Sequence, residues 1–121
     1  MKILEYSNRH IDTRRELTEF IIKDFPKIVE TKLVIVKEDH AILGKHYHPY
    51  TEELLFVAGE CVVKTWSEIE GNRETKLTAP MMIIFEEKEE HLLICEIGNI
   101  FIEYVPKVFN KDDNIPSKHI N

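Results

Sequence analysis

The sequence has few cysteines that could form disulfides, no apolar run that could span a membrane and no excess of basic residues that could bind a polyanion. Its 121 residues include only 2 cysteines and 4 glycines, and no apolar run approaches the length of a membrane span. The 16 basic side chains are outnumbered by 22 acidic ones, for a formal net charge of -6. Without a positive field to attract phosphates or anionic lipids, we expect neither nucleic acid nor a membrane as a partner.

The cysteines and the first residues favour the cytoplasm as the location of the protein. Cys61 and Cys95 lie far apart in separate apolar runs and form no C-x-x-C motif, so we expect both to be reduced and buried. The N-terminal segment lacks the apolar stretch of a signal peptide. With 43% hydrophobic residues, the chain is long enough for one compact domain, an enzyme or binding protein for a small molecule.

One amphipathic helix is predicted near the start of the chain. Thr13 and Glu16 have the spacing of a capping box, and the apolar residues that follow recur at steps of three and four. This pattern predicts a short N-terminal helix over residues 13–24, with Pro26 just beyond its end.

The rest of the chain consists of short β-rich runs separated by turn residues. Gly71 and Gly98, each followed by Asn, are the clearest hairpin signals. Eight runs at such short intervals indicate an all-β sandwich or barrel between about residues 28 and 106, with a peripheral tail over 107–121. The runs cover residues 32–37, 41–48, 53–58, 60–69, 73–77, 82–86, 91–97 and 100–105.

A cluster of histidines gives the strongest functional signal. Residues two apart in a strand point to the same face, so His46 and His48 project together into the interior. Glu52 keeps the same parity if the strand resumes after Pro49. His91 opens a later strand and could supply a third imidazole from across the barrel. Such polar side chains are costly to bury unless they bind a metal, titrate or bond one another.

One divalent metal ion would suit the four side chains of His46, His48, Glu52 and His91. With one or two positions left open, an octahedral site favours Fe, Mn, Co or Ni, and a four-coordinate Zn site is also compatible with these ligands. An open position would allow a carbonyl to be polarised, or water or oxygen to be activated. Without a metal, the imidazoles could act as general acid and base near neutral pH.

Residues 44–59 (GKHYHPYTEELLFVAG) resemble the first motif of the cupin superfamily. That motif has His-x-His, three or four residues, Glu, six residues and Gly, a spacing that selects Glu52 over Glu53, which is then expected to face solvent. Of the second cupin motif, His91 and its strand context remain. The resemblance implies a double-stranded β-helix, the cupin jelly-roll barrel, with a four-ligand metal site and a homodimer built on edge strands.

A narrower resemblance extends over most of the chain. Residues 12–19 (DTRRELTE) are similar to the N-terminal Asp-x-Arg-Gly-x-Leu stretch of cupins that isomerise or epimerise nucleotide-linked keto sugars, with Arg15 in place of the Gly. Residues 44–61 are similar to the sugar 3,4-ketoisomerase branch, whose His-x-His pair moves protons between adjacent carbons. The resemblance implies that His46 and His48 are the catalytic acid and base.

Four functions remain open from the sequence. They are a nucleotide-sugar isomerase or epimerase, which is the leading prediction, a metal-dependent oxygenase, a metal-dependent isomerase of free sugars, and a ligand-sensing barrel without catalysis. Four aromatic residues could line the cavity and stack on a sugar or base, namely Tyr50, Phe56, Trp66 and Tyr104.

Overall fold

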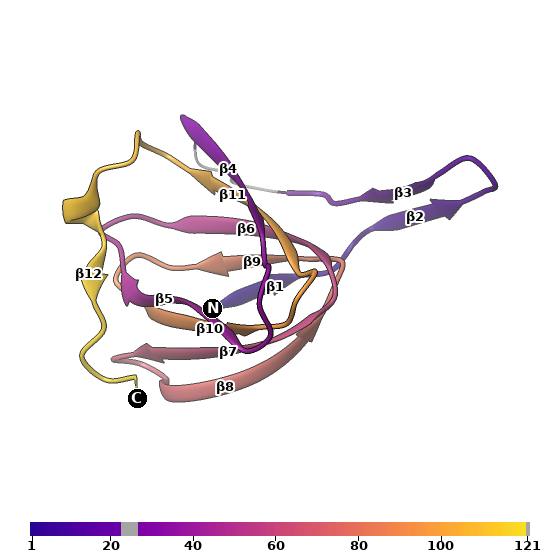
Figure 1. Ribbon diagram of the computed structural model, residues 1–121. Coiled ribbons are helices and arrows are strands. Elements are labelled where there is room, and N and C mark those ends of the chain that lie inside the picture. The colour runs from indigo at the N-terminus through magenta and orange to yellow at the C-terminus, as the bar shows by residue number, and fades with distance from the viewer. Residues whose placement is uncertain (23–26, 121) are drawn as a thin grey trace.

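The computed structural model of the protein describes residues 1–22 and 27–120 (Figure 1). Within these ranges the regular elements are strands and one 3-10 helix, η1 at Lys111–Asp113, and no helix there has the length and apolar character needed to cross a membrane. The strands are β1 Lys2–Leu4, β2 Asn8–Ile11, β3 Glu16–Glu19, β4 Glu30–Ile35, β5 Ala41–Tyr47, β6 Glu52–Ala58, β7 Glu60–Ser67, β8 Gly71–Thr78, β9 Met81–Phe85, β10 Glu90–Cys95, β11 Ile100–Val105 and β12 Ile115–Pro116.

Two five-stranded antiparallel sheets face each other and form the barrel (Figure 1). The first, named here the β6 sheet, has the strand order β1-β9-β6-β11-β4, and the second, the β5 sheet, has the order β12-β5-β10-β7-β8. The eight predicted runs correspond to β4 through β11. The prediction of an all-β cupin jelly-roll barrel is therefore confirmed.

Apolar side chains from both sheets fill the middle of the barrel. Phe56 on β6 and Phe101 on β11 stack with their ring centroids 4.7 Å apart, and both are buried. Cys61 and Cys95 lie opposite each other on β7 and β10, buried and without a disulfide, as predicted. Inward residues alternate with outward ones along these strands, so each strand contributes one face to the core.

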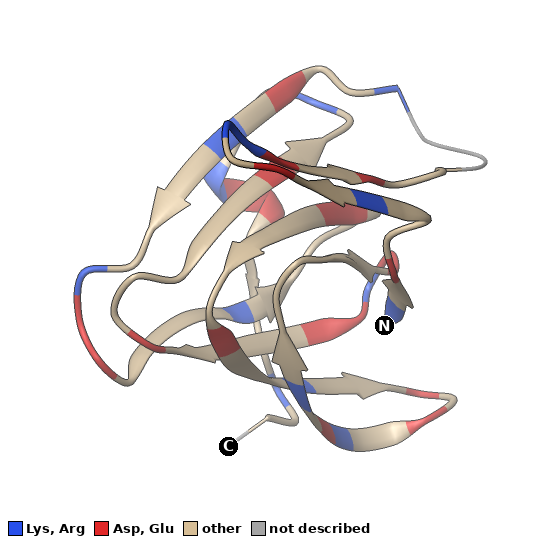
Figure 2. Cartoon of the chain, turned by 90° about the vertical axis from the view of Figure 1, so that its right-hand side faces the viewer, with Lys and Arg blue, Asp and Glu red and all other residues tan. Residues whose placement is uncertain are grey.

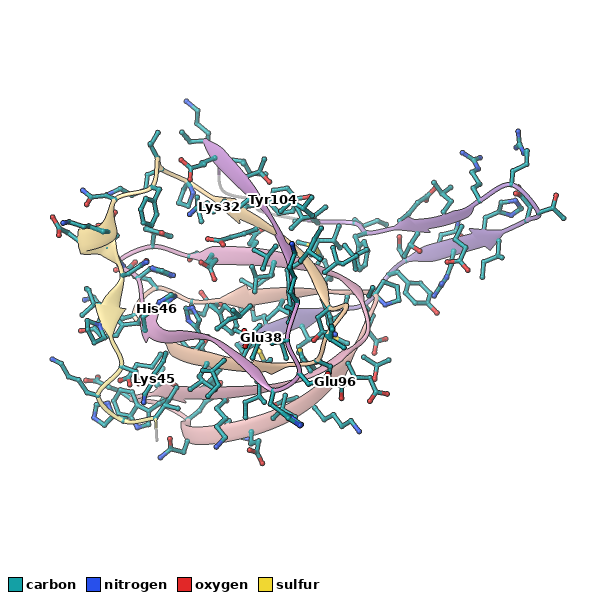
Figure 3. All side chains as sticks on the ribbon, viewed as in Figure 1. Lys32, Glu38, Lys45, His46, Glu96 and Tyr104 are labelled. Atoms are coloured by element: carbon teal, nitrogen blue, oxygen red, sulfur yellow. The ribbon has the colours of Figure 1, made fainter. Side chains whose placement is uncertain are left out.

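The two ends of the barrel carry different chemistry. Figure 3 places His46 at the end beside β12, whereas Glu38 and Glu96 lie toward the opposite end, in the loops that follow β4 and β10. Figure 2 shows basic and acidic residues interspersed along the chain rather than gathered in one segment. The predicted site lies at the end beside β12, so this end is the one that bears on function.

The predicted N-terminal helix is wrong over the described part of its range. Residues 13–22 contain no helix, and β2 and β3 instead form an antiparallel hairpin that extends from the barrel (Figure 1). The Asp12 carboxylate accepts hydrogen bonds from the backbone N–H groups of Arg14 and Arg15 at 2.8 and 3.0 Å, which stabilises the hairpin turn. The predicted helix end, with its proline, falls in residues 23–26, outside the described residues.

One of the two predicted glycine turns is displaced. Gly98 lies in the turn between β10 and β11 at a φ of +89°, as predicted. The other turn covers residues 68–70, because Gly71 already pairs with Ser67 at the start of β8. Gly71 has a φ of +67°, the conformation that commonly closes a three-residue hairpin loop.

The segment after β11 crosses the end of the barrel that carries the histidines. It includes η1 and β12, and Figure 1 shows it in yellow along the left-hand side. Within it, β12 pairs with β5 at His46 and Tyr47, and Ile120 near its end is buried. The segment therefore contacts the strand that carries the predicted site.

Candidate active site

A β-bulge in β5 aims the histidines into the barrel. His46 pairs with His91 on β10, but the next residue of β10 pairs with Gly44, so Lys45 is an extra residue. Gly44 and Lys45 have positive φ angles of +80° and +64°, and such distortions are typical of bulges. Because of the extra residue, Leu43 and His46, three positions apart, both line the same cavity.

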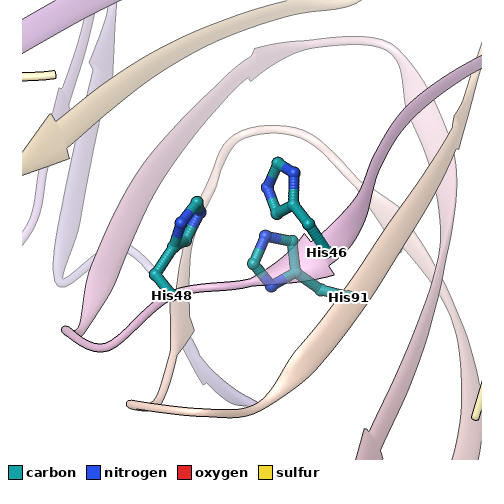
Figure 4. Close-up of side chains that lie close together, drawn as sticks. All are labelled: His46, His48 and His91. Atoms are coloured by element: carbon teal, nitrogen blue, oxygen red, sulfur yellow. The ribbon is translucent and has the colours of Figure 1, made fainter. Parts of the chain in front are cut away.

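Three imidazole rings converge at this end of the barrel, as Figure 4 shows. His46 lies on β5, His48 follows directly after it, and His91 is near the start of β10. One ring nitrogen of each residue lies within 4.8 Å of the others. His48 and His91 are buried, and His46 is partly buried. The pairing of β5 with β10 therefore brings together histidines that are distant in the sequence.

The carboxylate of Glu52 lies beside two of these rings. Glu52 begins β6 on the facing sheet and is buried. Its Oε2 is 3.0 Å from His48 Nε2, and its Oε1 is 3.6 Å from His91 Nε2. The four side chains that were predicted as metal ligands thus lie in one cluster.

Glu53 projects from the opposite side of β6, but the prediction that it faces solvent is wrong. It is only 4% exposed, and its Oε2 has no hydrogen-bond partner among the described residues. Its cross-strand neighbours Ile84 and Tyr104 flank it. Burial raises the pKa of the Glu53 carboxyl to about 7. Strand parity gives the direction of a side chain but not what covers it.

Burial and mutual charge set the protonation states in the cluster. Burial, reinforced by His91 and His48, lowers the pKa of His46 to about 4, and burial also lowers the pKa of His91. Burial opposes ionisation of Glu52, but the adjacent imidazoles outweigh it and lower the Glu52 pKa to about 2. Burial likewise acts to lower the pKa of His48, but the Glu52 carboxylate raises it overall. Near neutral pH, an ionised Glu52 faces neutral His46 and His91.

Backbone carbonyls orient two of the rings. His48 Nδ1 lies 2.9 Å from the carbonyl oxygen of Asp113, and His91 Nδ1 lies 3.1 Å from that of Glu89. A carbonyl can only accept, so each Nδ1 carries a hydrogen and donates it, and in the neutral form of either ring the lone pair lies on Nε2. Both Nε2 atoms are buried and make no aligned hydrogen bond within the described residues. Metal-binding histidines are usually oriented in this way.

A cavity of about 140 Å³ opens beside the cluster. Its lining includes three polar residues that the sequence analysis missed, Lys32, Glu103 and Asn114. Glu103 lies two residues after the inward Phe101 on β11 and therefore on the same face, so strand parity could have found it. Burial, reinforced by the Glu52 carboxylate, raises the pKa of Glu103 to about 7. Asn114 gave no signal, because it lies beyond the last predicted strand.

The four predicted aromatic residues lie in different places. Tyr50 lines the cavity and stacks on His48 with ring centroids 4.9 Å apart. Phe56 lies in the core, Trp66 lines a separate hollow on the outside of the barrel, and Tyr104 is on β11 (Figure 3). The structure therefore brings Tyr50, and not the other three, to the lining of this cavity.

The cluster fits a divalent metal ion. Three imidazole nitrogens and one carboxylate are donors that first-row divalent metals accept. The Nε2 atoms of His48 and His91 are buried polar atoms without an aligned partner among the described residues, and a cation would satisfy them. His46, His48 and His91 could therefore hold such an ion at the edge of the cavity, and the Glu52 carboxylate lies beside two of them as a fourth donor.

Comparison with solved structures identifies proteins of the same fold. No family model and no curated protein matches the sequence. The TDP-quinovose 3,4-ketoisomerase of Campylobacter jejuni is similar, with a TM-score of 0.77 and 15% sequence identity over 96% of this chain and 92% of that chain. A sugar 3,4-ketoisomerase of Thermoanaerobacterium thermosaccharolyticum, solved with TDP, has a TM-score of 0.75 and 14% identity over 94% of this chain and 85% of that chain.

An epimerase has the same architecture. The dTDP-4-dehydrorhamnose 3,5-epimerase of Bacillus anthracis has a TM-score of 0.74 and 17% identity, over 93% of this chain and 75% of that chain. Identities at this level establish likeness of fold rather than of reaction. The chain is therefore a cupin barrel of the kind found in sugar-nucleotide 3,4-ketoisomerases and 3,5-epimerases.

Proposed function

We propose that this cupin is a metal-binding isomerase or epimerase that moves a proton within a small polar keto substrate, a keto sugar or its nucleotide-linked form. The observation that carries the proposal is the convergence of three imidazoles and the Glu52 carboxylate beside one cavity. Structures of the same fold include enzymes named for 3,4-ketoisomerisation and 3,5-epimerisation of TDP-linked sugars, which supports the same class of reaction.

The metal would be held by His46, His48, Glu52 and His91. When bound, a divalent ion supplies a Lewis acid that polarises a carbonyl or hydroxyl oxygen. The ionised Glu52 and the neutral rings provide the charge and the lone pairs that ligation needs. The backbone carbonyls that accept from His48 and His91 keep both rings in one orientation, so the site is organised before a ligand arrives.

Isomerisation of a keto sugar consumes no co-reactant. A base removes the proton from the hydroxyl-bearing carbon beside the ketone, and the electron pair forms an enediolate. A proton then returns to the former carbonyl carbon, while the hydroxyl proton passes from one oxygen to the other. Tyr50 and Glu103 line the cavity and carry groups that can hold or donate such a proton while the histidines bind the metal.

A second candidate keeps the reaction but not the metal. His46 and His48 have ring centroids 4.4 Å apart, and both line the cavity. Two imidazoles so placed could act on adjacent carbons of one bound sugar, one as base and one as acid, as the sequence resemblance implies. Metal analysis separates this candidate from the first.

Elemental analysis of protein purified without added metal tests the site. We expect about one equivalent of a divalent metal in the wild type and a loss of roughly tenfold or more in His91→Gln. His10→Gln, on the β2–β3 hairpin, is the control for removing a histidine elsewhere. A correctly folded wild type that binds no added Fe, Mn, Co, Ni or Zn would contradict the metal site and leave the acid–base pair.

Solvent exchange tests the reaction. TDP-4-keto-6-deoxyglucose is incubated with the protein in D2O, and deuterium at the carbons beside the ketone is followed by NMR, with matched free keto sugars in parallel. Enzyme-dependent incorporation is expected for at least one substrate. Thermal stabilisation by a sugar without exchange would indicate a sensing barrel, and consumption of oxygen would indicate an oxygenase. Either result would replace the isomerase proposal.

We also propose that the chain forms a homodimer through the outer face of the β6 sheet. Leu33, Ile35 and Val57 are exposed on this face, and the β2–β3 hairpin extends from the barrel (Figure 1). An isolated hairpin is marginal in water and is stabilised by a partner surface. Light scattering should give twice the 14.3 kDa chain mass, reduced to one chain by Leu33→Asp but not by the exposed control Ile69→Asp. A monomeric wild type would contradict the proposal.

A further inference from the structure

A buried carboxylate outside the cavity holds the segment that crosses the barrel end. Glu90 is 2% exposed. Its Oε1 accepts hydrogen bonds from Ser117 Oγ at 2.5 Å and from the backbone N–H groups of Lys118 and His119, both at 2.8 Å. Its Oε2 lies 2.6 Å from His119 Nδ1. These hydrogen bonds compensate the buried carboxylate for its lost hydration.

Trp66 also contacts His119, the residue that is bonded to Glu90. The His119 ring stacks on Trp66 with ring centroids 3.5 Å apart and an angle of 6° between the planes. Ile120 is buried beside it, and its backbone N–H donates to Ser117 Oγ. One end of the segment is therefore fastened by charge, stacking and apolar burial together.

The middle of the segment reaches the site itself. The carbonyl oxygen of Asp113 accepts from His48 Nδ1 at 2.9 Å, and Asn114 lines the cavity. The backbone N–H of Ser117 donates to the carbonyl of Lys45, in the bulge of β5. The hydrogen bond that orients the His48 ring therefore comes from this segment and not from a barrel strand.

We propose that Glu90 and His119 form a latch that holds residues 107–120 over the cavity as a strap, and that the docked strap positions His48 for its role in the site. Glu90 is then a positioning residue that acts through the strap. When the latch is released, the Asp113 carbonyl moves away, and His48 loses the acceptor that keeps its hydrogen on Nδ1. The expected effect on metal binding rests on the proposed function, whereas the effect on the His48 tautomer does not.

The latch is tested by amide exchange. In the wild type, the backbone N–H groups of Lys118 and His119 should be protected, and they should exchange at least about tenfold faster in His119→Ala and in Glu90→Gln. Lys118→Ala is the matched control, because only its backbone contacts Glu90. Glu87→Gln, an exposed carboxylate in the loop that precedes β10, controls for loss of charge. Unchanged protection in His119→Ala would overturn the latch, even if Glu90→Gln fails to fold.

The positioning role is tested on His48 directly. NMR of the ring nitrogens should show the Nδ1–H tautomer in the wild type and in Lys118→Ala, and a mixture with the Nε2–H tautomer in His119→Ala. Zinc affinity should fall by about tenfold or more in His119→Ala. The single tryptophan gives an optical check, because the loss of the stacked imidazole should change Trp66 emission. A released strap with an unchanged His48 tautomer would overturn the positioning role, whether or not the protein binds metal.

Discussion

The two ends of the barrel differ in the kind of side chain that the strands bury there. Strand β10 runs from Glu90 and His91 at the cavity end to Cys95 at the other, and β6 runs from Glu52 to Ala58. At the cavity end, buried imidazoles and carboxylates face a hollow of about 140 Å³. At the opposite end, the same sheets close over an apolar core. The same paired strands form both ends, and only the buried side chains differ, polar at one end and apolar at the other.

This difference shows how a small barrel tolerates a costly site. Buried ionisable groups are stable only when charge or hydrogen bonds compensate for lost hydration. The cavity end contains buried polar atoms that make no aligned hydrogen bond among the described residues, including His48 Nε2 and His91 Nε2, although both lie near the Glu52 carboxylate. We therefore expect the apolar end to determine stability and the cavity end to determine binding. Four experiments test this expectation.

The largest effect is expected for the thiols at the apolar end. Burial raises the pKa of Cys61 to about 12 and that of Cys95 to about 11. Because the thiolate is the reactive form, thiol labelling with DTNB at pH 8 should be roughly a thousandfold slower in the native protein than in denaturant. Stopped-flow absorbance measures both rates. Rapid native labelling would show that this end is open to solvent.

Removal of an aromatic ring tests the core. Phe101→Ala should reduce the free energy of unfolding by about 3–5 kcal/mol, because it leaves a cavity where Phe101 stacks on Phe56. Urea denaturation followed by circular dichroism gives the value. Ile69→Ala, at an exposed position in the turn between β7 and β8, should cost less than about 1 kcal/mol. Equal losses would show that the stacked pair does not dominate the core.

Alanine substitutions at two glycines distinguish the effect of backbone strain from the effect of a steric contact at the site. Gly44 has a φ of +80°, and a Cβ there would lie 3.0 Å from the carbonyl oxygen of His91. Gly44→Ala should therefore cost about 2 kcal/mol or more and also weaken metal binding. Gly98→Ala is the matched control, with a φ of +89° but no atom near the added methyl group. If both variants lose the same stability and retain equal metal affinity, the Gly44 contact with His91 has no role.

The smallest effect is expected for a buried amide at the apolar end. Asn99 Oδ1 accepts from the backbone of Glu96 at 3.0 Å, and Asn99 Nδ2 donates to the carbonyl of Ala58 at 3.3 Å. Asn99→Ala should cost about 1–3 kcal/mol, because both backbone groups lose their partner. Asn72→Ala, at an exposed position on β8, should be nearly neutral in the same urea titration. A neutral Asn99→Ala would show that water replaces the amide.

The incorrect helix shows where local patterns mislead. Leu17 fits the apolar spacing of a helix, but it also fits the alternation of a strand. A four-residue segment such as β3 is too short to distinguish the helical period of 3.6 residues from the strand period of 2. Pairing with β2 and the side-chain hydrogen bonds of Asp12 decide for a hairpin. The eight barrel strands were predictable because alternation and turn residues repeat along most of the chain.

The barrel strands and the identity of the clustered residues can be predicted from local sequence patterns. Spacing pointed to His46, His48 and Glu52, and a later strand start pointed to His91, because ligand spacing and strand parity are local properties. The orientation of these side chains and the contacts that hold them depend on the folded chain. The bulge at Lys45 appears only when β5 pairs with β10. The acceptor for His48 lies 65 residues further along, at Asp113, and such a bond depends on the folded path of the chain and not on any local pattern.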